Sequence, residues 1–345
     1  MNNRAIKILV IGAVASSLLF LSGCGSSATT TGTATTTAVT TNALTGLPGA
    51  NGPVLFVKID DTRAAHPQIG LDSADVIYIE QVEGGLTRIA AVFSNKLPAK
   101  IGPIRSARIS DIDLMANYGR VGMAYSGAQS KFLPVLRAAN IEDIGADTEP
   151  ASIYSRDPSR SAPTDMLLNP KALLNKSINV EHRKITTAKS VGWSFGPLPL
   201  GGKAIKSAEL KWPAAKYKAV WSSATQRWKM YYNGTPDLAA NGVQLGSPTL
   251  LIQEVSITPS IYHDKLGSYT PFSNTVGSGT GYLLRDGQEI PVFWNRVSAT
   301  QATTWTLKDG SPAYLPVGQV WVALTDQKPA FVFPITSTPT PSASK

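Results

Sequence analysis

Three apolar stretches decide the fold of this chain: PVLFVKID (53–60), DVIYIEQV (75–82) and TRIAAVFS (87–94). Each is rich in β-branched and apolar residues and is bounded by turn residues, which is typical of buried β-strands. VGMAYSG (121–127) predicts a further short strand, and AQSKFLPVLRAAN (128–140) predicts a helix. Strands that alternate with helices indicate an α/β (α+β) N-terminal domain with a mixed sheet.

A second helix is expected after the Gly-Pro turn in KIGPIRSARISDID (100–113). Ser106 is its expected N-cap, because a serine side chain can accept a hydrogen bond from a backbone N–H of the first turn. Ile109, Ile112 and Ala116 then fall on one face at helical spacing. The sequence therefore predicts a helix from Ser106 to about Tyr118.

The second half of the chain has a different composition, since all seven tryptophans occur from Trp193 onward. We expect a β-rich C-terminal domain in which Arg285-Asp286-Gly287-Gln288 forms a tight turn between strands. Aromatic residues of this half either form its core or stack on a glycan, and the alternation of the strands favours the core. These residues are Trp221, Trp228, Tyr231, Tyr232, Trp294 and Trp305.

The first 24 residues match a bacterial lipoprotein export signal. Arg4 and Lys7 precede an apolar run that ends in Leu-Ser-Gly-Cys24, and the run is too short to span a membrane. We expect residues 1–23 to be removed, Cys24 to carry the lipid, and the chain to sit on the outer face of the cell membrane. Cys24 is the only cysteine, so neither disulfides nor cysteine catalysis are expected.

The remaining chain divides by composition. Residues 24–43 form an expected Thr/Ser-rich tether, and residues 333–345 an expected disordered tail. Between them we place the α/β domain at 44–200 and the β-rich domain at 201–332. Removal of Arg4 and Lys7 lowers the formal charge from +9 to +7. The positive charge that remains favours anionic envelope polymers, lipid headgroups or acidic protein partners. Export argues against nucleic acid as a partner.

The chain resembles the YerB-like lipoprotein family, which is defined by a domain of unknown function. The resemblance covers residues 44–325. It is most specific in VKIDDTRAAHPQIGLDSADVIYIEQVEGGLTRIAAVF (57–93), GPIRSAR (102–108) and YSRDPSRSAPTDM (154–166). Thr164 and Asp165 stand where the family often has His-Asn. The resemblance implies an envelope location and a two-part architecture, and it implies no activity.

Arginines in Gly-, Pro- and Ser-rich segments are the main candidates for a functional site. A guanidinium binds carboxylate or phosphate through a rigid two-pronged fork, and a helix start at Ser106 would add backbone N–H donors. We therefore predict an arginine-lined cleft for an anionic ligand. The alternative is an internal ion-pair network of Arg88, Arg105 and Arg108 with Glu83, Asp111 and Asp157. The candidate ligand-binding residues are Arg88, Arg105, Arg108, Arg156, Arg160, Glu83, Asp60, Asp157, Ser106 and Ser126.

Other functions have weaker support in the sequence. A Ser-His-Asp triad would need His66, His182 or His263 as its base, and Ser126 lacks the first glycine of a nucleophile elbow. Glu83-Gly84-Gly85 favours a hairpin turn over a phosphate loop. No cofactor or metal site is expected. A lipid-pyrophosphate phosphotransferase or glycopolymer transferase, which would need a divalent metal, and a scaffold for membrane proteins remain the alternatives to a binding protein.

Overall fold

The computed structural model describes residues 40–334. The expected signal peptide, the Cys24 lipidation site and most of the expected tether and tail therefore lie outside the described residues. No helix among the described residues combines the length and the apolar character needed to cross a membrane.

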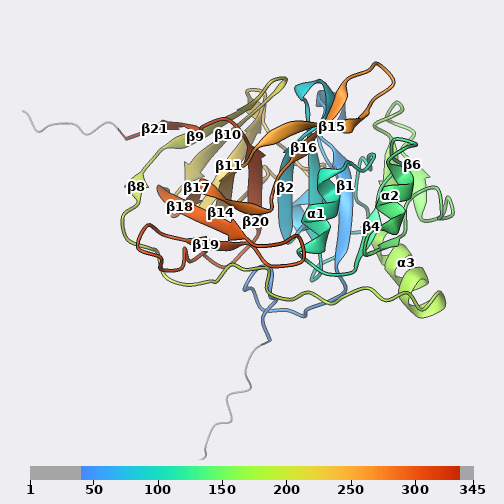
Figure 1. The fold of residues 1–345 in the computed structure, drawn as a ribbon, viewed down its shortest axis with the longest axis horizontal. Helices are drawn as coiled ribbons and strands as arrows, with labels where there is room; N and C mark the ends of the chain where they lie inside the picture. The colour runs from blue at the N-terminus through green and yellow to red at the C-terminus, as the bar shows by residue number, and fades with distance from the viewer. Residues whose placement is uncertain (1–39, 335–345) are drawn as a thin grey trace, which may run out of the picture. The chain divides into compact units, whose positions relative to one another are not determined.

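The first half builds the sheet that the three opening stretches predict (Figure 1). Strands β1 (Leu55–Asp60) and β3 (Thr87–Phe93) are antiparallel, as are β3 and β2 (Val76–Gln81). Parallel strands β4 (Val121–Ala124) and β5 (Ile141–Asp143) extend the sheet beyond β1. Parallel and antiparallel pairs thus coexist, and the predicted mixed sheet is confirmed.

The second half continues the same sheet. Strand β20 (Val320–Thr325) runs parallel to β2, and β14 (Thr249–Glu254) runs parallel to β20. Strands β17 (Gly277–Arg285) and β18 (Gln288–Arg296) follow as a hairpin whose turn is Asp286-Gly287, as predicted. Within residues 40–334 this sheet has eleven strands. Its remaining members are β19 (Thr304–Thr306) and β8 (Lys203–Ala204).

A smaller sheet of six strands packs on one face of the large sheet. Trp212 donates to the carbonyl of Leu324, and the rings of Tyr217 and Trp321 meet edge to face. Trp228, Tyr232, Trp294 and Trp305 are buried, and Trp221 and Tyr231 are half-buried, so most of these aromatics are core. The strands are β9 (Ser207–Trp212), β10 (Ala215–Ser222), β11 (Arg227–Tyr232), β12 (Thr235–Pro236), β13 (Gly246–Ser247) and β21 (Ala330–Val332).

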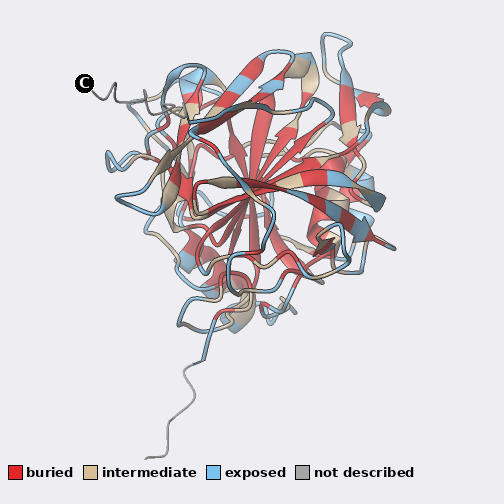
Figure 2. Ribbon diagram, turned by 90° about the vertical axis from the view of Figure 1, so that its left-hand side faces the viewer, coloured by how far each residue is buried: buried red, intermediate tan, exposed pale blue. Residues whose placement is uncertain are grey.

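The opposite face of the large sheet carries short helices and a projecting hairpin. Leu114 and Met115 of α1 and Leu136 of α2 join a core cluster with Phe56 and Val92 of the sheet. Figure 2 shows buried strands at the centre and exposed loops around them. The helices of this face are α1 (Ser110–Ala116) and α2 (Leu133–Ala138), and the projecting hairpin is β15 (Ile257–His263) with β16 (Tyr269–Ser273). Helix α3 (Pro170–Asn175) instead belongs, through Leu173 and Leu174, to the core cluster that contains the smaller sheet. Strands β6 (Tyr154–Arg156) and β7 (Met166–Leu168) form a separate pair, and single helical turns span Arg63–Ala65, Leu71–Ser73, Glu83–Gly85 and Lys176–Val180.

The predicted start of the helix at Ser106 is wrong. Residues 105–108 are not helical. The N–H of Arg105 donates to the Lys58 carbonyl and that of Ala107 to the Gly127 carbonyl. Helix α1 begins at Ser110, and its buried residues are Ser110, Asp111, Leu114 and Met115. The predicted apolar face is therefore also shifted: Ile109, Ile112 and Ala116 are only partly buried.

Candidate functional site

One face of the N-terminal sheet changes from apolar to charged along its strands. Alternate residues of β1 point to the side of α1, and they run from buried Phe56 through Lys58 to Asp60. The register places Asp60, Arg88 and Glu80 beside one another across β1, β3 and β2. Cross-strand neighbours in register point to the same face of a sheet. The ends of three strands therefore form a charged floor.

A fully buried ion cluster underlies this floor. The Lys58 ammonium contacts the Glu80 carboxylate and lies 2.8 Å from Oδ1 of Asp111, the second residue of α1. All three side chains are completely inaccessible to solvent. Buried charges persist only when they are paired, so Lys58 fixes α1 to β1 and β2 electrostatically.

The segment that contains Arg105 and Arg108 lies over the floor. Nε of Arg105 is 2.6 Å from Oδ2 of Asp60. Nε of Arg108 is 2.7 Å from Oε1 of Glu83, in the β2–β3 turn that the sequence predicted. Burial opposes ionisation of Glu83, but Arg108 and the Thr270 hydroxyl outweigh it and lower the pKa of that carboxyl. Arg105 and Arg108 are thus each matched by one carboxylate.

Arg88 differs from its neighbours. Its side chain is nearly buried, since the residue is 8% exposed, and its Nη1 donates to the carbonyl of Ser106 at 2.9 Å. Among the described residues it has no carboxylate within ion-pair distance. Burial and the charges of Arg108 and Arg105 lower the pKa of Arg88, and the charges of Glu83 and Asp60 offset this only in part. The guanidinium is therefore a cation whose charge is poorly compensated by the protein.

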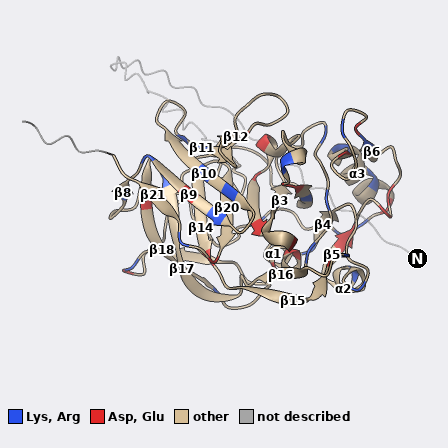
Figure 3. Ribbon diagram, turned by 90° about the horizontal axis from the view of Figure 1, so that it is seen from above, with Lys and Arg blue, Asp and Glu red and all other residues tan. Residues whose placement is uncertain are grey.

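These arginines line a cleft of about 670 Å³ that is open to solvent. Both halves of the chain contribute to its walls: residues 128–130 precede α2, and residues 263–266 form the tip of the β15–β16 hairpin. The hydroxyl of Thr270 on β16 donates to Glu83, which ties this hairpin to the floor. Figure 3 shows acidic and basic segments close together around α1 and β4. The cleft is lined by Glu83, Arg88, Arg105, Ser106, Arg108, Ala128, Gln129, Ser130, His263, Asp264, Lys265 and Leu266.

The other predicted site residues lie elsewhere or act indirectly. Arg156 is 59% exposed and pairs with Asp165 at 2.7 Å, away from the cleft lining. Arg160 donates to the carbonyls of Ala65 and Pro67 and lies 3.5 Å from Asp157. Ser126 contributes its backbone N–H, which donates to the Arg105 carbonyl. The structure thus brings together Arg88, Arg105, Arg108, Glu83, Ser106 and, through Arg105, Asp60.

The expected anion site at a helix start is also absent from this cleft. The Arg108 N–H donates to Oδ2 of Asp111 at 2.6 Å, so the helix's own first-turn carboxylate takes this donor. The side chains of Arg88, Arg105 and Arg108 are left as the anion-binding groups. Among residues 40–334, no cluster of three His, Cys, Asp or Glu side chains could hold a metal ion.

A histidine clamp that the sequence did not indicate lies between the two sheets. Nε2 of His66 is 3.2 Å from Asp61, and Nδ1 is 3.0 Å from Asp237. The ring stacks on Tyr232 with centroids 4.2 Å apart. Burial disfavours the charged ring, but hydrogen bonds to Asp237 and Asp61 outweigh it and raise the pKa of His66 to about 10. Because carboxylates occupy both ring nitrogens, His66 is placed as a cationic clamp and not as a catalytic base.

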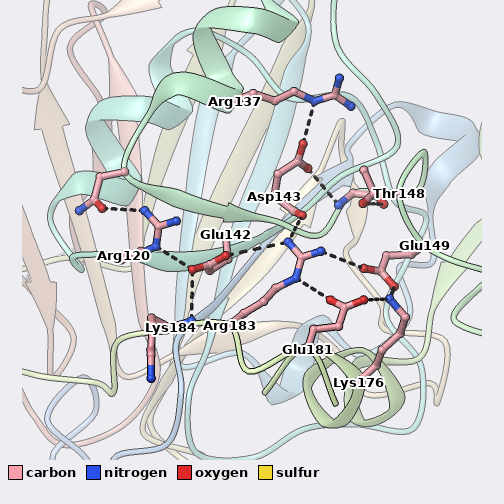
Figure 4. A network of polar contacts seen from close by, with 12 residues as sticks. Arg120, Arg137, Glu142, Asp143, Thr148, Glu149, Lys176, Glu181, Arg183 and Lys184 are labelled. Atoms are coloured by element: carbon pink, nitrogen blue, oxygen red, sulfur yellow. Dashed lines mark hydrogen bonds and ion pairs between the residues drawn. The ribbon is translucent and has the colours of Figure 1, made fainter. Parts of the chain in front are cut away.

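Another polar network fixes residues 176–184 against the edge of the sheet (Figure 4). Arg183 donates to the Asp143 carbonyl at 2.7 Å and to Glu181 at 2.6 Å. Lys176 bridges Glu149 and Glu181. The cations of this network are matched by carboxylates, so the network stabilises the position of this segment.

The fold and the cleft define a class of protein: a mixed-sheet α+β protein with an arginine cleft to which both halves contribute. Two family models match the chain, "Protein of unknown function (DUF3048) N-terminal domain" over residues 44–185 and its C-terminal counterpart over residues 208–322. The chain therefore belongs to the DUF3048 family, and the resemblance to YerB-like proteins is confirmed. The two family domains share one sheet; the boundaries drawn from composition stay a prediction.

Two relatives illustrate this membership. "Putative lipoprotein YerB" of Bacillus subtilis (strain 168) is 40% identical over 52 residues, which cover 15% of this chain and 16% of that protein. The crystal structure of the YerB protein from Bacillus subtilis has a TM-score of 0.72 at 18% identity, covering 84% of this chain and 99% of that one. At this identity the second similarity shows the shared fold alone.

Proposed function

We propose that this chain is a lipoprotein, anchored through Cys24 to the outer face of the cell membrane, that binds an anionic envelope ligand or the acidic part of a partner in the arginine cleft. The residues before Cys24 and the name of the Bacillus relative, a putative lipoprotein, support the anchor. The observation that carries the binding function is Arg88, a nearly buried guanidinium that lines an open cleft and has no carboxylate at ion-pair distance among the described residues. A bound anion would supply the missing negative charge.

Binding of pyrophosphate tests this proposal. In isothermal titration calorimetry of the full chain in nanodiscs of zwitterionic lipid, we expect Arg88→Gln to weaken binding by about tenfold or more, because it removes a charge-assisted hydrogen bond. Arg88→Lys should give an intermediate affinity, since Lys keeps the charge without the fork. Arg156→Gln is the matched control and should bind like the wild type, because Arg156 lies outside the cleft. Equal affinities of the wild type and Arg88→Gln would refute the proposal.

Glu83 provides a prediction of opposite sign. Its carboxylate occupies Arg108 and so competes with an incoming anion for the same guanidinium. We expect Glu83→Gln to bind pyrophosphate more tightly, by about threefold to tenfold, because the amide still fits the turn but carries no charge. The same titration measures this change. An affinity that falls in Glu83→Gln would mean that Glu83 orients Arg108 for the ligand instead of competing with it.

The same preparation separates binding from group transfer. Incubation with a lipid pyrophosphate and Mg²⁺, followed by chromatography of the products, detects transfer directly. Turnover that is lost in Arg105→Ala would indicate an enzyme. Tight binding without turnover would indicate a binding protein, which is the outcome we expect.

A further inference from the structure

The tip of the β15–β16 hairpin exposes three large apolar or aromatic side chains. Ile261 is 81% exposed, Leu266 is 92% exposed and Tyr269 is 62% exposed. The basic residue Lys265 lies beside them in the turn. Clustered apolar side chains on a surface usually mark a contact site. Aliphatic, tyrosine and lysine side chains together are typical of contacts with the membrane interface.

The hairpin tip meets the arginine cleft at Leu266. Leu266 lines the same cavity as Arg88, Arg105 and Arg108. Phe132 meets Tyr262 edge to face, and the N–H of Ser273 donates to the Ser110 hydroxyl at 3.0 Å, so the hairpin is held against α1 and α2. The cavity of about 670 Å³ falls in the range of about 300–1,000 Å³ of small-molecule sites. The cleft thus offers cations at its floor, an apolar rim, and room for more than a simple anion.

We infer that the anion taken by the cleft is the phosphate headgroup of a membrane lipid, whose hydrocarbon chain lies against Leu266 and leaves the cleft along the hairpin tip. This inference rests on the proposed anion-binding function and specifies its ligand. Phosphate oxygens suit the guanidinium forks of Arg88 and Arg108. A ligand that joins a phosphate to a hydrocarbon chain matches both chemistries of the cleft, whereas a polar wall polymer leaves the apolar rim uncovered.

The tether limits how far the fold can lie from the bilayer. The 16 Cα–Cα steps from Cys24 to Thr40 span at most about 55 Å. This reach matters, because the chain enters the described fold on the side away from β15 and β16 (Figure 1). A protein tethered to the bilayer also meets its lipids at a high effective concentration, so moderate affinity suffices.

Two soluble phosphate esters that differ only in the length of their alkyl group test the inference. We would titrate the full chain in zwitterionic nanodiscs with methyl phosphate and with hexyl phosphate, and use empty nanodiscs as the blank. Hexyl phosphate should bind about tenfold tighter or more, since each buried CH₂ adds favourable transfer free energy. Leu266→Ser should remove most of this preference. Val180→Ser, at an exposed valine outside the cleft lining, is the matched control.

The outcomes distinguish this inference from the function on which it rests. If both phosphates bind equally and Arg88→Gln weakens the binding of both, the inference of a lipid ligand is wrong, but the proposed anion-binding function stands. A preference for hexyl phosphate that survives Leu266→Ser together with Ile261→Ser would also contradict the inference, because the hexyl group would then bind elsewhere on the protein. If neither phosphate binds, the anion-binding function itself fails. A preference for hexyl phosphate over methyl phosphate that is lost in Leu266→Ser and kept in Val180→Ser would support the inference.

Discussion

Replacing His66 by Phe should lower the free energy of unfolding by about 3–5 kcal/mol. Phenylalanine can keep the stacking on Tyr232, but it removes the only cation that lies between Asp61 and Asp237 in the described part of the chain. Asp61 retains donors from Thr87 and Tyr217. Asp237 is almost fully buried and would lose its His66 partner. Urea denaturation followed by tryptophan fluorescence measures the change.

The loss should depend on pH in a defined direction. The pKa of His66 is raised from its ordinary value of 6.5 to about 10, so the folded protein holds a proton that the unfolded chain releases. The stabilisation is complete below about pH 6.5 and is lost as the pH rises through about 10. The difference between wild type and His66→Phe should therefore be largest near pH 6 and smallest above about pH 10. His263→Phe, at an exposed histidine, should change stability by less than about 0.5 kcal/mol. A pH-independent difference would contradict a charged clamp.

Replacing Lys58 by Met should have a comparable effect, about 3–5 kcal/mol. The substitution leaves the Glu80 and Asp111 carboxylates completely buried without their cation. Asp111 keeps the N–H of Arg108 as a donor, so most of the cost falls on Glu80. The double variant Lys58→Met/Glu80→Met should therefore recover at least half of the lost stability, because apolar residues of similar volume can replace a buried ion pair.

Lys189→Met is the matched control for this experiment. Lys189 is exposed, so its replacement should change stability by less than about 0.5 kcal/mol. Thermal unfolding of all three variants gives the comparison. If Lys58→Met were as stable as Lys189→Met, or if the double variant were less stable than the single one, the ion cluster would not be the element that fixes α1 to the sheet.

The strands of this protein could be predicted because their sequence pattern is local. In β1 to β3, apolar and β-branched residues on both faces predict buried strands, and the structure places them within one or two residues of the expected bounds. The Asp286-Gly287 turn was equally predictable, because both residues adopt positive φ angles that this residue pair favours. What the sequence did not show is that β2 and β20 lie side by side, which joins both family domains in one sheet.

The helix start was mispredicted because tertiary contacts overrode a local signal. Ser106 resembles an N-cap, but the backbone around it is held by Lys58 and by the carbonyl of Gly127. His66 was missed for a similar reason. Its partner Asp237 is 171 residues away in the chain, and a histidine before a proline in a turn gives no sign of a buried ion pair.

The arginine site was predictable in part. Arg105 and Arg108 share one segment, and Arg88 faces them because it begins the strand that follows the Glu83 turn. Arg156 and Arg160 have the same residue type and similar surroundings in sequence, yet their side chains bind other groups. The β15–β16 hairpin, which completes the cleft, lies too far along the chain for any sequence pattern to place it there.

The most direct test of the arginine cleft is a crystal structure of the wild-type chain soaked with selenate at the concentration that half-saturates binding in calorimetry. The account predicts an anomalous peak in the cleft within hydrogen-bond distance of the Arg88 guanidinium, and no peak there in Arg88→Gln crystals. An empty cleft with Arg88 still bound only to the Ser106 carbonyl would contradict it.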